Sequence, residues 1–233
     1  MMIRAISRIS GRSAILAALS ASMLLSLVSS LSIRYGHADV PVAETAEQIQ
    51  PLEVGRSAPR FTVETVDNKP FEFDPRGLDR PALVIMIRGG WCMYCNAHLS
   101  ELRHVVPEIA ASGVDVLFLS GDRPELLYRS LERETQDTIE GLDYRILSDA
   151  GANAAIAFGI AFRVPNTVLE SRHAKGDDIA ESSMARHGIL PVPSVFAIDR
   201  DGMIAFAHSE PNYKVRLPAY ELLEVASTMI AAR

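Results

Sequence analysis

The spacing of apolar residues changes abruptly in the middle of the chain. Residues 82–87 read ALVIMI, an unbroken apolar run between Pro81 and a position just before a pair of glycines. A run without polar alternation is typical of a strand that is buried on both faces of a sheet. Between residues 93 and 109, apolar residues recur at every third or fourth position, which indicates a helix. The pattern therefore predicts a central strand followed at once by a helix, with Pro107 bending that helix.

The same kind of pattern extends in both directions. Residues 60–73 alternate apolar and polar positions on both sides of Asp67-Asn68, which predicts a β-hairpin. After the central strand, strands and helices are expected to alternate, as they do in parallel crossover units. Asp122 is placed to cap the second helix of this series. The expected strands are 82–87, 113–121, 143–149 and a pair within 193–209, and the expected helices are 93–109, 122–135, 150–160 and 217–233.

Two segments interrupt this alternation. Residues 39–53 are rich in Pro, Ala and Glu without apolar periodicity, so we expect a flexible tether that leads into a domain spanning residues 54–233. Residues 163–188 are polar and only weakly helical, and they precede the strand that is expected to start at Ser194. We interpret residues 163–188 as a surface insertion and as a candidate cover for the functional site.

The N-terminus has the features of a secretory leader. Three arginines precede an apolar segment at residues 13–33, and small residues lie just before an exit at Ala38. We therefore predict a leader over residues 1–38 that is cleaved after export. The alternative is an uncleaved anchor that tethers the protein through residues 13–33, because a bilayer needs roughly 20 apolar residues. Both interpretations place the domain outside the cytoplasm, and we expect the periplasm.

Length and charge narrow the classes of function. The chain has 233 residues and a formal net charge of −6. Cleavage after residue 38 would remove arginines and no acidic residue, so the mature protein would be more acidic still. This balance argues against a nucleic-acid partner. The remaining length suits one domain with a substantial core.

The two cysteines of the chain, Cys92 and Cys95, lie where the central strand turns into the helix. In an exported protein they form a disulfide unless it is continually reduced. A disulfide that closes so short a loop removes little chain entropy, so a purely structural bridge is disfavoured. A redox role fits the position better, because open α/β sheets carry their chemistry at the C-terminal ends of strands.

The two sulfurs are expected to differ in reactivity. Cys92 falls at or just before the first helical turn, where unpaired backbone N–H groups and the helix dipole favour a thiolate. Cys95 lies one turn further in, and its sheltered sulfur keeps a higher pKa. We therefore predict that Cys92 attacks the substrate and that Cys95 resolves the intermediate.

Longer motifs around the cysteines carry a resemblance to a known family. The segments IRGGWCMYCNAHLSEL and LPVPSVFAIDRDGMIAFAHSEPNYKVR are similar to the peroxiredoxin-like branch of the alkyl hydroperoxide reductase and thiol-specific antioxidant (AhpC/TSA) family, in the thioredoxin superfamily. The resemblance extends from about residue 54 to the C-terminus. It implies an α/β thioredoxin fold, with a central mixed β-sheet flanked by helices, an N-terminal β-hairpin and the insertion before the last strand pair.

The resemblance also assigns roles to Val192 and Pro193. Pro193 matches the cis-proline of the superfamily, so the Val192–Pro193 bond is expected to be cis and to lie against the Cys92 sulfur, and we treat this arrangement as a condition of the fold. The Val192 carbonyl and N–H groups would then be free to pair with an incoming extended chain.

Near the thiol, this chain departs from the family pattern. Ordinary peroxiredoxins carry a proline seven residues and a threonine or serine three residues before the attacking cysteine, and here these positions hold Ile85 and Gly89. Relatives also carry an arginine on a nearby strand, whereas Ser194 follows Pro193 here. Arg88 is therefore the candidate cation that stabilises a thiolate and polarises a peroxide, unless it simply snorkels from the strand end.

Two further side chains lie close to the cysteines in the sequence. Trp91 adjoins Cys92 and is a candidate shield and docking surface, although a tryptophan at a strand end also serves plain packing. His98 follows Cys95 by three residues, and we interpret it as a solvated helix residue.

Three functions fit these residues. The favoured one is a thiol peroxidase, in which a hydroperoxide oxidises Cys92, Cys95 closes a disulfide, and a thioredoxin-like protein reduces it. The second is an exported thiol-disulfide oxidoreductase that acts on protein disulfides. The third is a non-enzymatic copper carrier with His208 as a distant ligand, although copper-delivering relatives usually space their cysteines further apart. We expect no cofactor and no metal, and the sequence leaves the oligomeric state open.

Overall fold

The computed structural model describes residues 41–127, 129 and 145–231. The chain divides into two units, residues 1–39 and residues 40–233, and the description concerns the second of them. The leader predicted over residues 1–38 lies outside the described residues.

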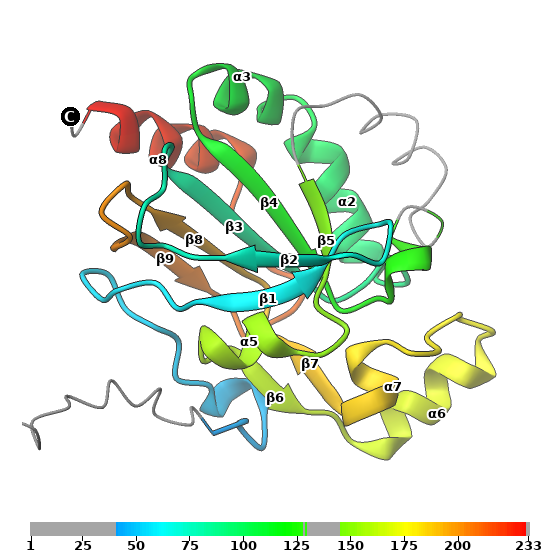
Figure 1. Ribbon diagram of the computed structural model, residues 1–233. Helices are drawn as coiled ribbons and strands as arrows, with labels where there is room; N and C mark the ends of the chain where they lie inside the picture. Colours follow the sequence, from blue (N-terminus) through cyan, green and yellow to red (C-terminus); the bar gives the residue numbers. More distant parts are fainter. Residues whose placement is uncertain (1–40, 128, 130–144, 232–233) are drawn as a thin grey trace, which may run out of the picture. The chain divides into compact units, whose positions relative to one another are not determined.

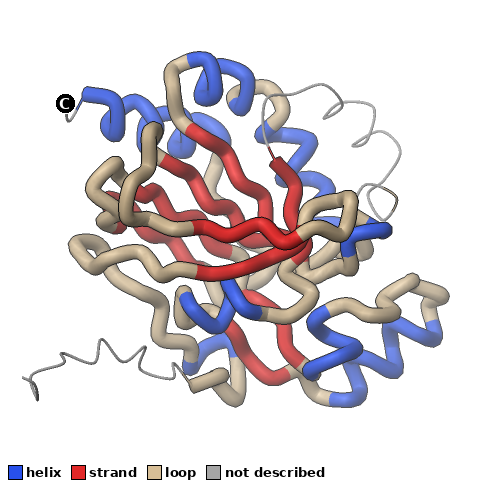
Figure 2. Tube along the Cα trace, in the orientation of Figure 1, coloured by secondary structure: helices blue, strands red, loops and turns tan. Residues whose placement is uncertain are grey.

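A mixed sheet with helices on both faces forms the centre of the described part (Figures 1 and 2). Its strands are β1 (Phe61–Glu64), β2 (Pro70–Phe73), β3 (Ala82–Ile87), β4 (Asp115–Ser120), β5 (Arg145–Ser148), β8 (Ser194–Ile198) and β9 (Ile204–Ser209). They lie in the order β2-β1-β5-β4-β3-β8-β9. β3, β4 and β5 run parallel, whereas the β1–β2 and β8–β9 hairpins add antiparallel strands at the two edges.

Helices cover the sheet on two sides. The helices of the central fold are α2 (Met93–Leu102), α3 (Val106–Ala111), α5 (Asn153–Ala157) and α8 (Ala219–Ala231). α2, α3 and α8 pack on one face, and α5 packs on the other (Figure 1). This arrangement confirms the α/β thioredoxin fold with a central mixed sheet that the sequence predicts.

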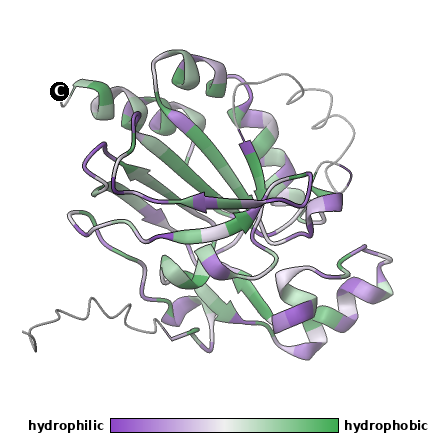
Figure 3. Ribbon diagram, viewed as in Figure 1, coloured by the Kyte–Doolittle hydropathy of each residue, from purple (hydrophilic) through white to green (hydrophobic). Residues whose placement is uncertain are grey.

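β3 shows how one strand serves both cores. All of its side chains are buried. Leu83, Ile85 and Ile87 pack under α2, α3 and α8, whereas Ala82, Val84 and Met86 face the core on the α5 side. Because side chains alternate between the faces of a strand, a strand inside the sheet needs apolar residues at every position. The central strands are accordingly coloured as hydrophobic in Figure 3.

The predicted turns of the chain also form. Asn68 adopts a left-handed φ of 58° in the hairpin turn between β1 and β2, a conformation that asparagine tolerates well. α2 ends at Leu102 and α3 begins at Val106, with Pro107 in the first turn of α3. The helix expected over residues 93–109 is therefore broken into two helices rather than bent, because proline cannot donate the hydrogen bond that would continue α2.

Asp122 has a different role from the predicted helix cap. In the described part of the segment 122–135, the short 3-10 helix η2 (Pro124–Leu126) has Arg123 as its N-cap residue. The Asp122 carboxylate instead accepts a hydrogen bond from the Gly90 N–H. Residues 128 and 130–144, which include most of the helix expected there, lie outside the described residues.

The segment 41–53, expected to be part of a tether, is hydrogen bonded to the folded unit. Ala43 exchanges backbone hydrogen bonds with both ends of β6 (Ala161–Arg163), and the Gln50 N–H donates to the Gly159 carbonyl. Composition alone suggested a free segment, because these backbone partners are distant in the sequence and leave no local pattern. We call residues 41–53 the N-terminal arm.

The predicted insertion over residues 163–188 is carried on a small antiparallel ribbon. β6 pairs with β7 (Ile189–Pro191), and between them lie α6 (Asn166–Ala174) and α7 (Ser183–His187) (Figure 1). The ribbon leads directly into β8, so the insertion precedes the last strand pair as expected.

Among the described helices, none combines the length and the apolar composition required to cross a bilayer. The apolar segment at residues 13–33 lies outside the described residues.

Candidate thiol redox site

The two thiols lie at the start of α2, directly after the loop that follows β3. Cys92 is the N-cap residue of α2, and Cys95 lies in its first turn. Both side chains are reduced and buried, with 4% of Cys92 and 0% of Cys95 exposed. The predicted position of the pair at a strand-to-helix junction is thus what the structure shows.

The loop before Cys92 is held from two sides. The Asp122 carboxylate accepts a 2.7 Å hydrogen bond from the Gly90 N–H, and the Asn96 amide donates to the Gly90 carbonyl at 2.6 Å. A Cβ on Gly89 would lie 2.4 Å from the Trp91 indole nitrogen. The position where peroxiredoxins carry threonine or serine therefore has no room for a side chain while Trp91 keeps this orientation.

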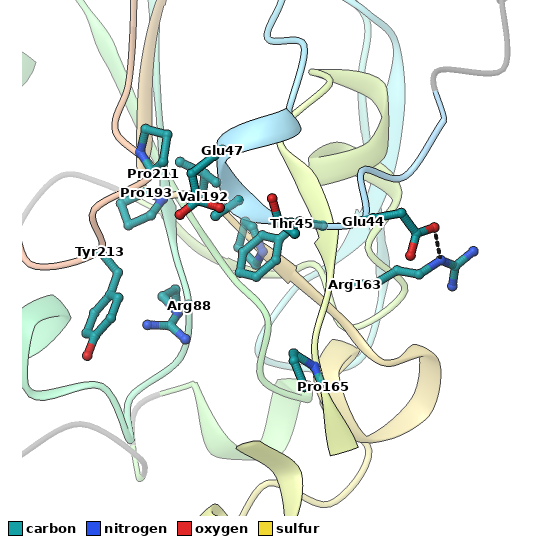
Figure 4. Close-up of a pocket in the computed structure, with 13 residues that line it drawn as sticks. Glu44, Thr45, Glu47, Arg88, Arg163, Pro165, Val192, Pro193, Pro211 and Tyr213 are labelled. Atoms are coloured by element: carbon teal, nitrogen blue, oxygen red, sulfur yellow. Dashed lines mark ion pairs between the residues drawn. The ribbon is translucent and has the colours of Figure 1, made fainter. Parts of the chain in front are cut away.

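Arg88 brings a buried guanidinium to the site. Its side chain is 9% exposed, and within the described residues its Nε has no hydrogen-bond partner. The guanidinium carbon lies 4.6 Å from the Tyr213 ring centroid and 5.2 Å from that of Trp91. Figure 4 shows the guanidinium beside the Tyr213 ring. Arg88 is thus enclosed by aromatic rings rather than snorkelling into solvent.

A second arginine, which the sequence analysis did not single out, reaches the other sulfur. The Arg216 Nη2 donates to the Cys95 Sγ at 3.4 Å. Its Nη1 donates to the carbonyl of Val215 at 2.8 Å and to that of Tyr213. Arg216 belongs to the connection between β9 and α8, which has no regular structure, so no periodicity in the sequence marks it.

The environment separates the pKa values of the two thiols. A hydrogen bond from the Cys95 side chain, assisted by the charges of Arg88 and Arg216, lowers the pKa of Cys92 to about 6 despite its burial. Burial raises the pKa of the Cys95 thiol well above its usual range, and the neighbouring Cys92 raises it further. The directions of both shifts agree with the expectation that Cys92 is the nucleophile and Cys95 the resolving thiol.

The difference between the pKa values of the two thiols can be tested by alkylation. Iodoacetamide should alkylate reduced Cys92 at a rate that rises as pH increases through about 6 and then levels off, because only the thiolate reacts. Mass spectrometry of the quenched protein assigns the label. The Cys92→Ser variant is the control, and its Cys95 should react only at higher pH. Faster labelling of Cys95 in the unsubstituted protein would reverse the assigned roles.

The insertion covers one side of Trp91. The Arg172 guanidinium carbon on α6 lies 4.6 Å from the Trp91 ring centroid. Ile179, Met184 and Leu190 form a small buried cluster that packs against the same ring. Trp91 is therefore partly buried beneath the insertion, which acts as the cover for this side of the site, as the sequence analysis suggested.

Two predictions about Val192 and Pro193 are wrong. The described backbone contains no cis peptide bond, so the Val192–Pro193 bond is trans. The fold is nevertheless formed, so a cis bond is not the condition that the sequence analysis made it. The Val192 backbone is also not free: its N–H donates to the Ile160 carbonyl, and its carbonyl accepts from the Ser194 hydroxyl, both at 2.9 Å. The ribbon that carries the insertion supplies Val192 with a partner that the motif alone could not indicate.

An apolar pocket adjoins Arg88 on the side of Val192 and Pro193 (Figure 4). Its volume is about 280 Å³. Residues Glu44–Glu47 of the N-terminal arm form one wall of the pocket. They overlap the 3-10 helix η1 (Ala46–Gln48). The remaining lining residues are Arg88, Phe162, Arg163, Pro165, Pro191, Val192, Pro193, Pro211 and Tyr213. The pocket thus brings three of the predicted site residues together with the arm.

His98 is buried, in contrast to the solvated residue expected from the sequence. Its side chain is 5% exposed, and its Nε2 lies 2.9 Å from the Leu217 carbonyl oxygen. Burial lowers the pKa of His98 to about 4, so the imidazole is neutral near neutral pH. The contact fastens the β9–α8 connection, and with it Arg216, to the helix that carries the cysteines.

Among the residues that the structure describes, no group of three or more His, Cys, Asp or Glu side chains is positioned to hold a metal ion.

A sheet of this topology with a C-x-x-C pair at the N-terminus of a helix defines a thiol oxidoreductase of the thioredoxin superfamily. The family model described as "AhpC/TSA family" matches residues 54–207, and the chain belongs to that family.

Relatives in the family differ in activity. The thiol-disulfide oxidoreductase ResA of Bacillus thuringiensis is 20% identical over 169 residues, which cover 72% of this chain and 77% of that protein. The peroxiredoxin Bcp of Escherichia coli is 30% identical over 113 residues, which cover 48% of this chain and 67% of Bcp.

Solved structures show the same fold. A peroxiredoxin-like protein from Aquifex aeolicus aligns with a TM-score of 0.59 at 19% identity, covering 77% of this chain and 89% of that one. The peroxidoxin BcpB of Mycobacterium tuberculosis aligns with a TM-score of 0.54 at 17% identity, covering 78% and 99% of the two chains.

Proposed function

We propose that the protein is a thiol peroxidase that reduces hydroperoxides through Cys92. The observation that carries the proposal is the placement of a thiol with a lowered pKa at the α2 N-terminus, next to the buried guanidinium of Arg88. A thiolate supplies the nucleophile, and a desolvated cation stabilises the negative charge that develops on the departing oxygen.

The backbone of Val192 favours a small substrate over a protein. An extended protein chain needs free backbone groups with which to pair, and the Val192 N–H and carbonyl are already hydrogen bonded. A peroxide needs no such pairing, because it has to reach only the sulfur and a hydrogen-bond donor.

The proposed cycle has three steps: oxidation of Cys92, closure of the disulfide and reduction of the disulfide. The Cys92 thiolate attacks one peroxide oxygen, so the O–O bond breaks, an S–O bond forms, and water or an alcohol leaves after taking up a proton. Cys95 then attacks the sulfur of the Cys92 sulfenic acid, so the S–O bond breaks, the Cys92–Cys95 disulfide forms, and the departing hydroxide leaves as water with the Cys95 proton. A thioredoxin-like dithiol protein reduces the disulfide by thiol exchange.

The pocket beside Arg88 supports organic hydroperoxides as substrates. Eight of its thirteen lining residues are proline, aromatic or small aliphatic residues, and Arg88 contributes a buried charge. Such a lining favours the apolar part of an alkyl hydroperoxide. Cys92 itself does not line the pocket, so we assign the pocket to the body of the substrate rather than to its reacting oxygens.

We also propose that the protein acts in the periplasm. Export to the periplasm, with residues 1–38 either removed or kept as an anchor, rests on the N-terminal sequence pattern alone. There the disulfide would require a dithiol donor that is itself kept reduced.

The alternative function is that of a thiol-disulfide oxidoreductase, and the ResA relatives favour it. In that case the Cys92–Cys95 pair would exchange with protein disulfides, and the insertion would have to move away from Trp91 to admit a partner chain.

Stopped-flow mixing of the reduced protein with hydroperoxides tests the proposal. Trp91 is the one tryptophan of the chain and adjoins Cys92, so its fluorescence reports oxidation of that sulfur. We expect a second-order fluorescence change with hydrogen peroxide and with cumene hydroperoxide, at least about a hundredfold faster than for an unactivated thiol such as free glutathione.

An insulin-reduction assay run in parallel tests the alternative. A slow peroxide reaction together with rapid insulin reduction would overturn the peroxidase proposal in favour of disulfide exchange.

A further inference from the structure

The resolving step requires a thiolate at the more deeply buried of the two sulfurs. Cys95 is fully buried, and burial raises the pKa of its thiol. A neutral thiol attacks a sulfur electrophile poorly, so closure of the disulfide would be slow unless a nearby group stabilises the anion. The structure places one such group in direct contact.

Arg216 is the side chain that meets this need. Its Nη2 lies 3.4 Å from the Cys95 Sγ, within the range of a hydrogen bond to sulfur. The two backbone carbonyls that accept from Nη1 aim the guanidinium, and the buried contact between Leu217 and His98 anchors the next residue to α2. This arrangement holds a permanent positive charge against Cys95 before any reaction begins.

We infer that Arg216 is a catalytic residue of the resolving step, in which its guanidinium pairs with the Cys95 thiolate while that sulfur attacks Cys92. The two arginines then act in different steps: Arg88 stabilises charge during the oxidation of Cys92, and Arg216 stabilises the Cys95 thiolate during disulfide closure. The inference rests on the proposed roles of the two cysteines, but it does not depend on which oxidant reaches Cys92.

The step is balanced without any further reactant. The S–H bond of Cys95 and the bond between Cys92 and its leaving group break, and the Cys92–Cys95 bond forms. After peroxide, the leaving hydroxide and the thiol proton combine as water. After a disulfide reagent, the leaving group departs as a thiolate and the proton goes to solvent.

The charged and titratable groups near Cys95 come from four elements. Arg88 at the end of β3 contributes a backbone N–H, α2 contributes Cys92 and His98, and the β9–α8 connection contributes Arg216. His208 on β9 lines a small cavity together with His98 and Arg216. Within the described residues, Arg216 is the cation whose hydrogen bond reaches the Cys95 sulfur.

The test uses dithiodipyridine, a neutral disulfide that reports both thiols in turn. Attack by Cys92 releases a first thiopyridone, and attack by Cys95 on the resulting mixed disulfide releases a second. Near neutral pH, Arg216→Met should slow the second release about tenfold, because loss of the positive charge raises the pKa of Cys95 further and leaves less thiolate. The first release should slow much less, because Arg216 is only one of several groups that lower the pKa of Cys92.

The pH profile separates a catalytic role from a structural one. The second release in Arg216→Met should approach the rate of the unsubstituted protein once the pH exceeds the raised pKa, and Arg216→Lys should restore part of the rate at neutral pH. Arg200→Met, on an exposed arginine in the β8–β9 turn, is the matched control and should change neither release.

Two outcomes would overturn the inference: a second release that Arg216→Met leaves unchanged, or one that it slows equally at every pH. Because dithiodipyridine replaces peroxide, these outcomes are distinct from failure of the peroxidase proposal, which the peroxide reaction alone decides.

Discussion

The Cys92→Ser variant should lose peroxide reduction by at least about a thousandfold, because a serine hydroxyl at this position has neither a lowered pKa nor a base to activate it. The same variant should show no Trp91 fluorescence change on mixing with peroxide. Consumption of peroxide, followed by a colorimetric assay, provides an independent measurement. Substantial residual activity would mean that the reacting group is elsewhere.

The matched control for this variant is Cys95→Ser. It keeps the nucleophile and replaces the resolving thiol by a hydroxyl that can still donate a hydrogen bond to Cys92, so it should reduce one equivalent of peroxide and then stop as a sulfenic acid. Dimedone, which reacts with sulfenic acids, should label Cys92 in Cys95→Ser and should label neither residue in Cys92→Ser. Repeated turnover by Cys95→Ser with a thioredoxin-like donor would show that resolution does not require the second cysteine.

Arg88→Met should lower the second-order rate constant for peroxide by about a hundredfold, the usual effect of removing one preorganised donor from a developing oxyanion. The Arg88 charge also helps to lower the pKa of Cys92, so the pH at which alkylation of Cys92 levels off should rise. Stopped-flow fluorescence measures the rate constant, and the alkylation profile measures the pKa.

Arg88→Lys separates the charge from the shape of this residue. Lysine retains the positive charge but cannot present a planar guanidinium between the Trp91 and Tyr213 rings, so an intermediate rate is expected. Circular dichroism checks that each variant is folded. A peroxide rate in folded Arg88→Met equal to that of the unsubstituted protein would remove Arg88 from the mechanism.

Local patterns in the sequence were sufficient for much of the fold. The unbroken apolar run at residues 82–87 became an inner strand, because both faces of the sheet are covered. The change of period after this run located the start of α2, and with it Cys92 as the N-cap residue. These features depend on neighbouring residues, and the sequence shows them directly.

Contacts between residues that are far apart in the sequence could not be predicted from local patterns. Arg216 is the last residue of one of the two segments that resemble the family, but it reaches Cys95 from 121 positions further along the chain, and the segment alone does not indicate that contact. His98 looked solvated because its partner, the Leu217 carbonyl, is 119 positions away in the sequence. The resemblance to the family suggested free backbone groups at Val192, but the β6–β7 ribbon supplies the hydrogen bond that occupies its N–H.

The N-terminal arm has a consequence for comparisons among relatives. The family model matches residues 54–207 of the chain. Glu44–Glu47 precede this shared region, and Tyr213 and Arg216 follow it, although all of them line the pocket or contact the reactive sulfurs. An alignment trimmed to the shared region would therefore leave out one wall of the pocket beside Arg88 and the arginine that contacts Cys95.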